Sequence, residues 1–138
     1  MIHILIVDDQ PYLCELFPPV LRGKNCSITC VNNIESVKRW LTHSTPDVVL
    51  LEISLHGFDG WDVLHYIKTE NPHVPVVIVT SYDNYLNDPR LSQVDGYVVK
   101  NFSTFNELEE KIADVLQWKT VSQPYNNRYL IQAGTKSP

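Results

Sequence analysis

The stretch at residues 4–9, ILIVDD, decides the fold: four apolar residues stand in a row and two acids follow them. Three further runs have the same character, at residues 48–51 (VVLL), 76–79 (VVIV) and 97–99 (YVV). Each run is continuous, rich in β-branched residues and too short for a free-standing helix. This pattern is typical of parallel strands that are buried on both faces. A weaker strand is expected at residues 27–31.

The segments between these strands have helical spacing. Asn33 is placed to cap one helix, Gly60 leads into a second, and Thr104 with Glu107 matches a capping box for a third. Strand and helix alternate along the chain. This alternation predicts an α/β fold in which an open parallel sheet carries helices on both faces.

Two segments interrupt the alternation. Pro18-Pro19 falls inside the first expected helix, where proline removes a backbone hydrogen bond, so a kink or an early stop is expected. The segment at 80–96 contains Pro89 and several asparagines, so only a short or irregular helix is expected there. We interpret residues 1–120 as the domain and residues 121–138, which show no period, as a disordered or loosely docked tail.

Length, charge and cysteine use bound the classes of function. The 138 residues suffice for one domain, and a formal net charge of −5 argues against a dedicated nucleic-acid binder. No window of about 18 apolar residues is present, and residues 1–3 lack the basic flank of a secretory signal, so we expect a cytoplasmic protein without a membrane span. In such a reducing compartment free thiols are expected at all three cysteines: Cys14, Cys26 and Cys30.

Polar residues follow each of the buried strands. Asp8 and Asp9 follow the first run, Glu52 the second, Thr80 the third and Lys100 the last. The carboxyl ends of parallel strands meet at one edge of the sheet, which is where open α/β sheets bind ligands. Clustered carboxylates suit a hard divalent cation, and a lysine beside a hydroxyl suits anionic phosphoryl oxygens. A purely structural alternative is that the two aspartates cap a helix and the lysine neutralises a carboxylate.

At this point the chain resembles the receiver domain of the response regulators of two-component signalling, over about residues 1–120. The resemblance rests on five ordered motifs: Asp8-Asp9, PDVVLL at 46–51, GFDGW at 57–61, VTS at 79–81 and DGYVVK at 95–100. It implies a doubly wound, five-stranded parallel sheet with strand order 2-1-3-4-5. It also implies phosphorelay signalling through a protein partner, either a histidine kinase or a downstream effector, with no direct contact to nucleic acid and no enzymatic activity.

The resemblance also implies roles for individual positions. The Mg²⁺ site falls on Asp8, Asp9, Glu52 and the backbone carbonyl of Ser54. The residues that contact the phosphoryl group or switch with it are Thr80, Tyr97 and Lys100.

Glu52 departs from the family, because the phosphoacceptor there is aspartate. Phosphoryl transfer depends on positioning, so one extra methylene is a serious change. Three interpretations remain open: Glu52 partly mimics the phosphorylated state, it only locks a salt bridge to Lys100 in a fixed docking module, or it is phosphorylated itself or replaces an aspartate by engineering. We expect impaired or absent phosphorylation, and weak or absent Mg²⁺ binding if Glu52 pairs with Lys100.

Two smaller departures flank the same pocket. Asn101 follows Lys100 where the family usually has a proline, often after a cis bond, and a trans bond is expected here. His56 stands where the family usually has another proline, and we expect it to be an exposed loop side chain without a role.

Two other classes fit the residues less well. A small Mg²⁺-dependent phosphohydrolase of the haloacid dehalogenase type needs Asp-x-Asp, whereas the two acids here are adjacent. A flavin-binding flavodoxin-like protein needs a Ser/Thr-rich phosphate loop after the first strand, and the sequence has none there.

Overall fold

A five-stranded parallel sheet forms the centre of the domain. The computed structural model describes residues 1–11, 13–15, 25–83, 85–101 and 104–116. The strands are β1 (Ile2–Val7), β2 (Cys26–Val31), β3 (Val48–Leu51), β4 (Val76–Thr80) and β5 (Gly96–Val99). Every neighbouring pair is parallel and the order is β2-β1-β3-β4-β5, which confirms the expected fold class.

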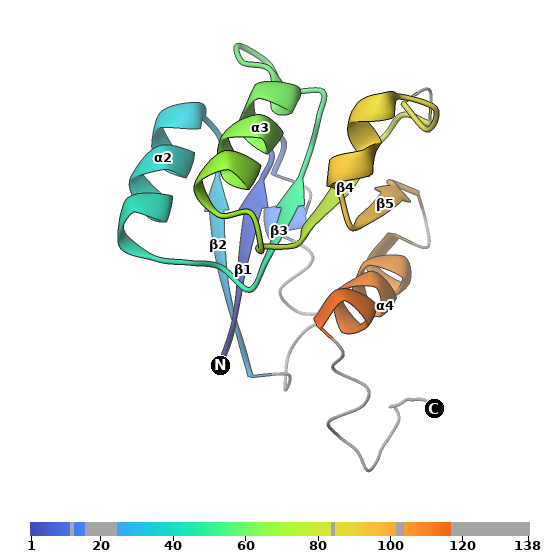
Figure 1. Ribbon diagram of the computed structural model, residues 1–138. Helices are drawn as coiled ribbons and strands as arrows, with labels where there is room; N and C mark the ends of the chain where they lie inside the picture. The colour runs from blue at the N-terminus through green and yellow to red at the C-terminus, as the bar shows by residue number, and fades with distance from the viewer. Residues whose placement is uncertain (12, 16–24, 84, 102–103, 117–138) are drawn as a thin grey trace.

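Helices cover both faces of this sheet. Helices α2 (Ile34–His43) and α3 (Gly60–Glu70) lie together over one face, and α4 (Thr104–Leu116) lies apart from them near β5 (Figure 1). Leu5 and Val7 of β1 belong to the apolar cluster under α2 and α3. Ile4 and Ile6 belong to the cluster under α4. The run at residues 4–7 is apolar without a break because both of its faces are buried.

The helix starts agree with the sequence where their side chains are described. The Oδ1 atom of Asn33 accepts a hydrogen bond from the Ser36 amide at 2.8 Å, and Oδ1 of Asp59 accepts one from the Trp61 amide at 2.8 Å. These bonds satisfy amides that have no partner within the helix. The capping-box side chain of Thr104, the Pro18-Pro19 segment and the tail lie outside the described residues.

The expected fourth helix is short and irregular, as its composition predicts. Between β4 and β5 the described residues form only a 3₁₀ helix, η1 (Pro89–Gln93). Asp88 caps it, and the hydrogen bonds from Arg90 lower the pKa of Asp88 to about 2. Within the described residues no peptide bond is cis, so the Lys100–Asn101 bond is trans. In the part of the chain that the structure describes, no helix has the length and apolarity needed to cross a membrane.

The expectation of three free thiols is wrong. Cys14, in the helical turn at residues 13–15, forms a disulfide with Cys30 near the end of β2, and their Cα atoms lie 6.1 Å apart. Cys26 is not part of this disulfide. The partners are 16 residues apart in sequence, and only the return of the chain from the first helical turn to β2 brings them together. Cysteine count and spacing therefore could not reveal the pair.

A close backbone approach fixes where α3 begins. A Cβ atom at Gly60 would lie 2.5 Å from both Cα and O of Ile53 and 2.8 Å from the Glu52 carbonyl oxygen. The first turn of α3 therefore packs directly on the chain that leaves β3. Gly57 differs, because it has a φ of +82° and open space around a Cβ.

We predict that Gly60→Ala lowers the free energy of unfolding by about 2–3 kcal/mol, because backbone atoms at Ile53 cannot yield to the added methyl group. Gly57→Ala is the matched control and loses only about 1 kcal/mol, from its left-handed φ alone. Urea unfolding of both variants measures the difference. Equal losses in the two variants contradict the close approach.

Candidate functional site

Lys100, which follows β5, binds the acidic side chains that follow two other strands. Its Nζ lies 2.8 Å from Oδ2 of Asp8, after β1, and 3.0 Å from Oε1 of Glu52, after β3. Asp8 and Glu52 are buried, with 4% and 5% of their surface exposed. Asp8, Glu52 and Lys100 therefore meet at one edge of the sheet, as predicted.

Backbone hydrogen bonds hold these side chains in register. The Glu52 amide donates to the carbonyl of Val7 at 2.9 Å, and the Lys100 amide donates to the carbonyl of Thr80 at 2.8 Å. Both bonds continue the sheet pairing by one residue beyond the strands. The side chains of Glu52 and Lys100 consequently leave from rigid backbone rather than from loops.

Burial and the ion pair have opposite effects on the pKa values of Asp8 and Lys100. Burial raises the pKa of Asp8, even though the hydrogen bond from Lys100 acts to lower it. Burial alone would lower the pKa of Lys100, but the hydrogen bond to Asp8 and the charges of Asp8 and Glu52 raise it. Lys100 thus stays protonated at neutral pH, and its charge is what permits two carboxylates to be buried beside each other.

Both oxygens of Asp8 and both oxygens of Glu52 accept hydrogen bonds. The second oxygen of Asp8, Oδ1, accepts from the Gln10 amide at 2.9 Å. The second oxygen of Glu52, Oε2, accepts from the Ser54 amide at 2.9 Å. Together with Lys100, these amides satisfy both carboxylates inside the pocket.

Asp9 has a different partner from Asp8. Its Oδ2 accepts a hydrogen bond from the His56 amide and lies 2.7 Å from Nδ1 of the His56 ring. Burial alone would raise the pKa of Asp9, but these hydrogen bonds lower it. His56 is exposed as expected, and both its main chain and its ring contact an acid of the cluster. The buried Oδ1 of Asp9 accepts no hydrogen bond.

The pocket as folded does not fit the Mg²⁺ that the resemblance implies. Five of the six carboxylate oxygens of Asp8, Asp9 and Glu52 already have a protein donor. Among the described residues, no three acidic, histidine or cysteine side chains are arranged to hold a metal ion. The remaining carboxylate oxygen of these three acids is Oδ1 of Asp9, which has no hydrogen-bond donor.

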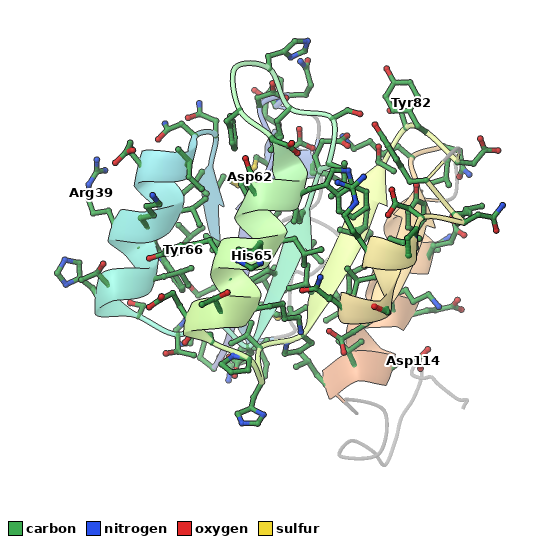
Figure 2. All side chains as sticks on the ribbon, turned by 45° about the horizontal axis from the view of Figure 1, so that its top comes forward. Arg39, Asp62, His65, Tyr66, Tyr82 and Asp114 are labelled. Atoms are coloured by element: carbon green, nitrogen blue, oxygen red, sulfur yellow. A yellow bond between two sulfur atoms is a disulfide. The ribbon has the colours of Figure 1, made fainter. Side chains whose placement is uncertain are left out.

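Thr80 and Tyr97, for which the resemblance implies a phosphoryl contact or a switch role together with Lys100, take no part in the ion pair. Thr80 is fully buried, and its Oγ1 accepts a long hydrogen bond, 3.5 Å, from the Tyr82 amide. The Tyr97 hydroxyl donates to the Tyr82 carbonyl at 2.7 Å. The Tyr82 side chain itself points away from the domain (Figure 2).

Tyr85 is a pocket residue that the sequence did not reveal. Its hydroxyl lies 3.0 Å from Oγ of Ser54, and its ring meets the Trp61 ring edge-on with centroids 5.8 Å apart. The guanidinium of Arg90 lies over the other ring, 3.9 Å from the Trp61 centroid. The irregular segment after β4 is thereby tied to α3 and to the loop after Glu52. No periodicity marks Tyr85, so only the folded chain identifies it.

A family model described as the response regulator receiver domain matches residues 4–113. The chain is 35% identical, over 74% of its length, to the probable transcriptional regulatory protein TcrX of Mycobacterium tuberculosis. It is 30% identical, over 96% of its length, to the probable transcriptional regulator ycf27 of Cyanidium caldarium. It covers 44% of the first and 55% of the second, so it spans about half the length of these relatives.

Solved structures agree with these matches. The response regulator TrrA of Thermotoga maritima, in complex with Mg²⁺-BeF, is 32% identical and superposes with a TM-score of 0.76, covering 84% of this chain and 100% of that one. TrrA in complex with the histidine kinase ThkA gives a TM-score of 0.75 at the same identity, covering 84% of this chain and 99% of that one.

We predict that Lys100→Met is less stable than the original chain by about 3 kcal/mol at pH 7, because two buried carboxylates lose their counter-charge. The loss shrinks as the pH falls. Asp8 already has a pKa raised above its ordinary 3.8, so its folded form takes up a proton before its unfolded form does, and protonation favours the folded state. Urea unfolding between pH 4 and pH 7 measures the trend. A loss that is independent of pH contradicts the charge explanation.

Proposed function

This chain belongs to the response regulator receiver domain family, and on that premise we propose that it is an atypical receiver that signals through protein–protein contacts without acyl phosphorylation of Glu52. The observation that carries the proposal is the state of the Glu52 carboxylate. One of its oxygens binds Lys100 and the other binds the Ser54 amide.

A phosphoacceptor must present a free oxygen to an incoming phosphorus atom. Glu52 is 5% exposed and each of its oxygens accepts one hydrogen bond, so a phosphoryl donor would have to reach a buried oxygen that Lys100 or the Ser54 amide already holds in place. The extra methylene relative to aspartate also displaces the carboxylate along the direction in which the donor must approach. Misplacement of a nucleophile by about 1 Å is enough to cost roughly 100-fold in rate.

The contacts of Glu52 favour a locked salt bridge over a mimic of the phosphorylated state. A mimic would have the Thr80 hydroxyl donate to the acidic group, but among the described residues the donors to Glu52 lie elsewhere. Glu52 bonds instead to Lys100 and to Ser54 within its own loop. The carboxylate also carries one negative charge, compared with about 1.5 to 2 for a phosphoryl group. The domain is therefore a docking module with one conformation.

We assign its partner to the class of signalling proteins. The similar receiver TrrA has been solved with the histidine kinase ThkA, which supports a kinase or a downstream effector as the partner of this chain as well. The charge of −5 supports protein contact over direct binding to nucleic acid. In this proposal Mg²⁺ takes no part in signalling, since Lys100 already supplies a positive charge to both buried acids.

The test is incubation with Mg²⁺ and a small acyl phosphate donor, followed by intact mass. We expect no 80-dalton adduct on the original chain, because Glu52 offers no free oxygen. An adduct that is absent from Glu52→Ala would falsify the proposal.

Glu52→Asp is the matched variant. It retains the charge and shortens the side chain by one methylene, so it should release the Lys100 contact and gain an adduct under the same conditions. Failure of Glu52→Asp to react would place the block elsewhere in the pocket.

A further inference from the structure

We propose that His56 is an internal competitor of divalent cations, which closes Asp9 and keeps Mg²⁺ out of the acidic cluster. The inference concerns the metal position of the pocket described above and rests on the receiver function proposed for it. It does not depend on whether Glu52 can be phosphorylated. It accounts for the disagreement between a family that implies a cation and a pocket whose oxygens are already satisfied.

The contact between His56 and Asp9 is a two-point clamp. The main-chain N–H and the ring Nδ1 of His56 both reach one oxygen, Oδ2 of Asp9. A carboxylate can only accept hydrogen bonds, so both groups act as donors there. A hard cation would need the lone pairs that these two donors occupy.

Residue 56 creates this clamp through its type. A proline at this position, as the resemblance implies for the family, would have neither a main-chain N–H nor a ring that could donate a hydrogen bond. Histidine supplies both donors at once. With histidine in place of proline, the Asp9 carboxylate therefore accepts two hydrogen bonds from residue 56 that proline could not donate.

The clamp can be released, because it lies at the surface. The His56 side chain is 83% exposed, whereas that of Asp9 is 12% exposed. Removal of the ring leaves the protein core intact and frees one of the two bonds to Oδ2. The neighbouring Oδ1 of Asp9 is buried and has no hydrogen-bond donor, so a cation that reaches Asp9 would gain it as a ligand.

Lys100 cannot perform the same task at Asp9. Its Nζ contacts Asp8 and Glu52, and both of those acids are satisfied by it and by main-chain amides. Asp9 is consequently the acid through which a cation can compete, and His56 is the group against which it competes.

The experiment is a calorimetric titration of the full chain with MgCl₂ at constant ionic strength, which separates site binding from screening. We expect His56→Ala to bind Mg²⁺ about fivefold more tightly than the original chain, since one hydrogen bond to a charged group no longer opposes binding. His56→Pro removes both donors and should bind more tightly still. His65→Ala, which removes an exposed imidazole on α3 (Figure 2), should match the original chain.

A second substitution locates the gain. Asp9→Asn in the His56→Ala background should return the Mg²⁺ affinity to the original level or below it. The proposal is overturned if His56→Ala binds no more tightly than the original chain, if it shows no binding, or if the gain survives Asp9→Asn. An 80-dalton adduct on the original chain would overturn the proposed function alone and leave this ranking of affinities unaffected.

Discussion

The ammonium group of Lys100 is the point on which the pocket depends. It follows β5, and its two partners follow β1 and β3, so a single side chain spans β4 and joins the ends of three strands. Without it, Asp8 and Glu52 would be two buried like charges with only main-chain amides to stabilise them. The cost of burying an unpaired carboxylate exceeds the gain from any one of those hydrogen bonds. The position of Glu52 is therefore a consequence of this ion pair as much as of the strand that carries it.

The ion pair is also connected, through a series of contacts, to the segment after β4 that contains Tyr85. Glu52 accepts a hydrogen bond from the Ser54 amide, the Ser54 hydroxyl meets Tyr85, and the Tyr85 ring contacts Trp61. The first contact lies within the loop after β3, the second joins this loop to the segment after β4, and the third joins that segment to the first turn of α3. A carboxylate held in one place by Lys100 thus holds the surface around Tyr85 in one place as well. These contacts support the proposal that the domain is a docking surface with a single conformation.

The sequence predicted those features that follow from burial and from strand ends. The five strands and their parallel direction could be predicted because a strand covered on both faces must be apolar throughout, as residues 4–7 are, whereas the order of the strands followed from the family resemblance. The meeting of Asp8, Glu52 and Lys100 could be predicted because parallel strands end at one edge. The Cys14–Cys30 disulfide and the Tyr85 contact could not, because both join segments whose relative position is set by the packing of irregular chain. The contact of His56 with Asp9 could not be predicted for another reason: a side chain can be exposed and still bind a partly buried acid, so exposure says nothing about its partner.

The two departures from the family, at residues 52 and 56, have the same physical effect. Each places a hydrogen-bonding group of the chain where a receiver would admit a ligand: the longer carboxylate of Glu52 reaches Lys100, and the donors of His56 reach Asp9. Either change alone would leave the pocket half open, with a cation still able to bind at Asp9 or a phosphoryl donor still able to approach residue 52. They account for three of the five carboxylate oxygens that accept hydrogen bonds within the chain, and Asp8 supplies the other two. A pocket whose polar atoms are satisfied internally gains little from any ligand, because binding must first break bonds that already exist. The proposed loss of phosphorylation and the proposed weakening of the cation site would therefore be one change in the pocket, made at two positions.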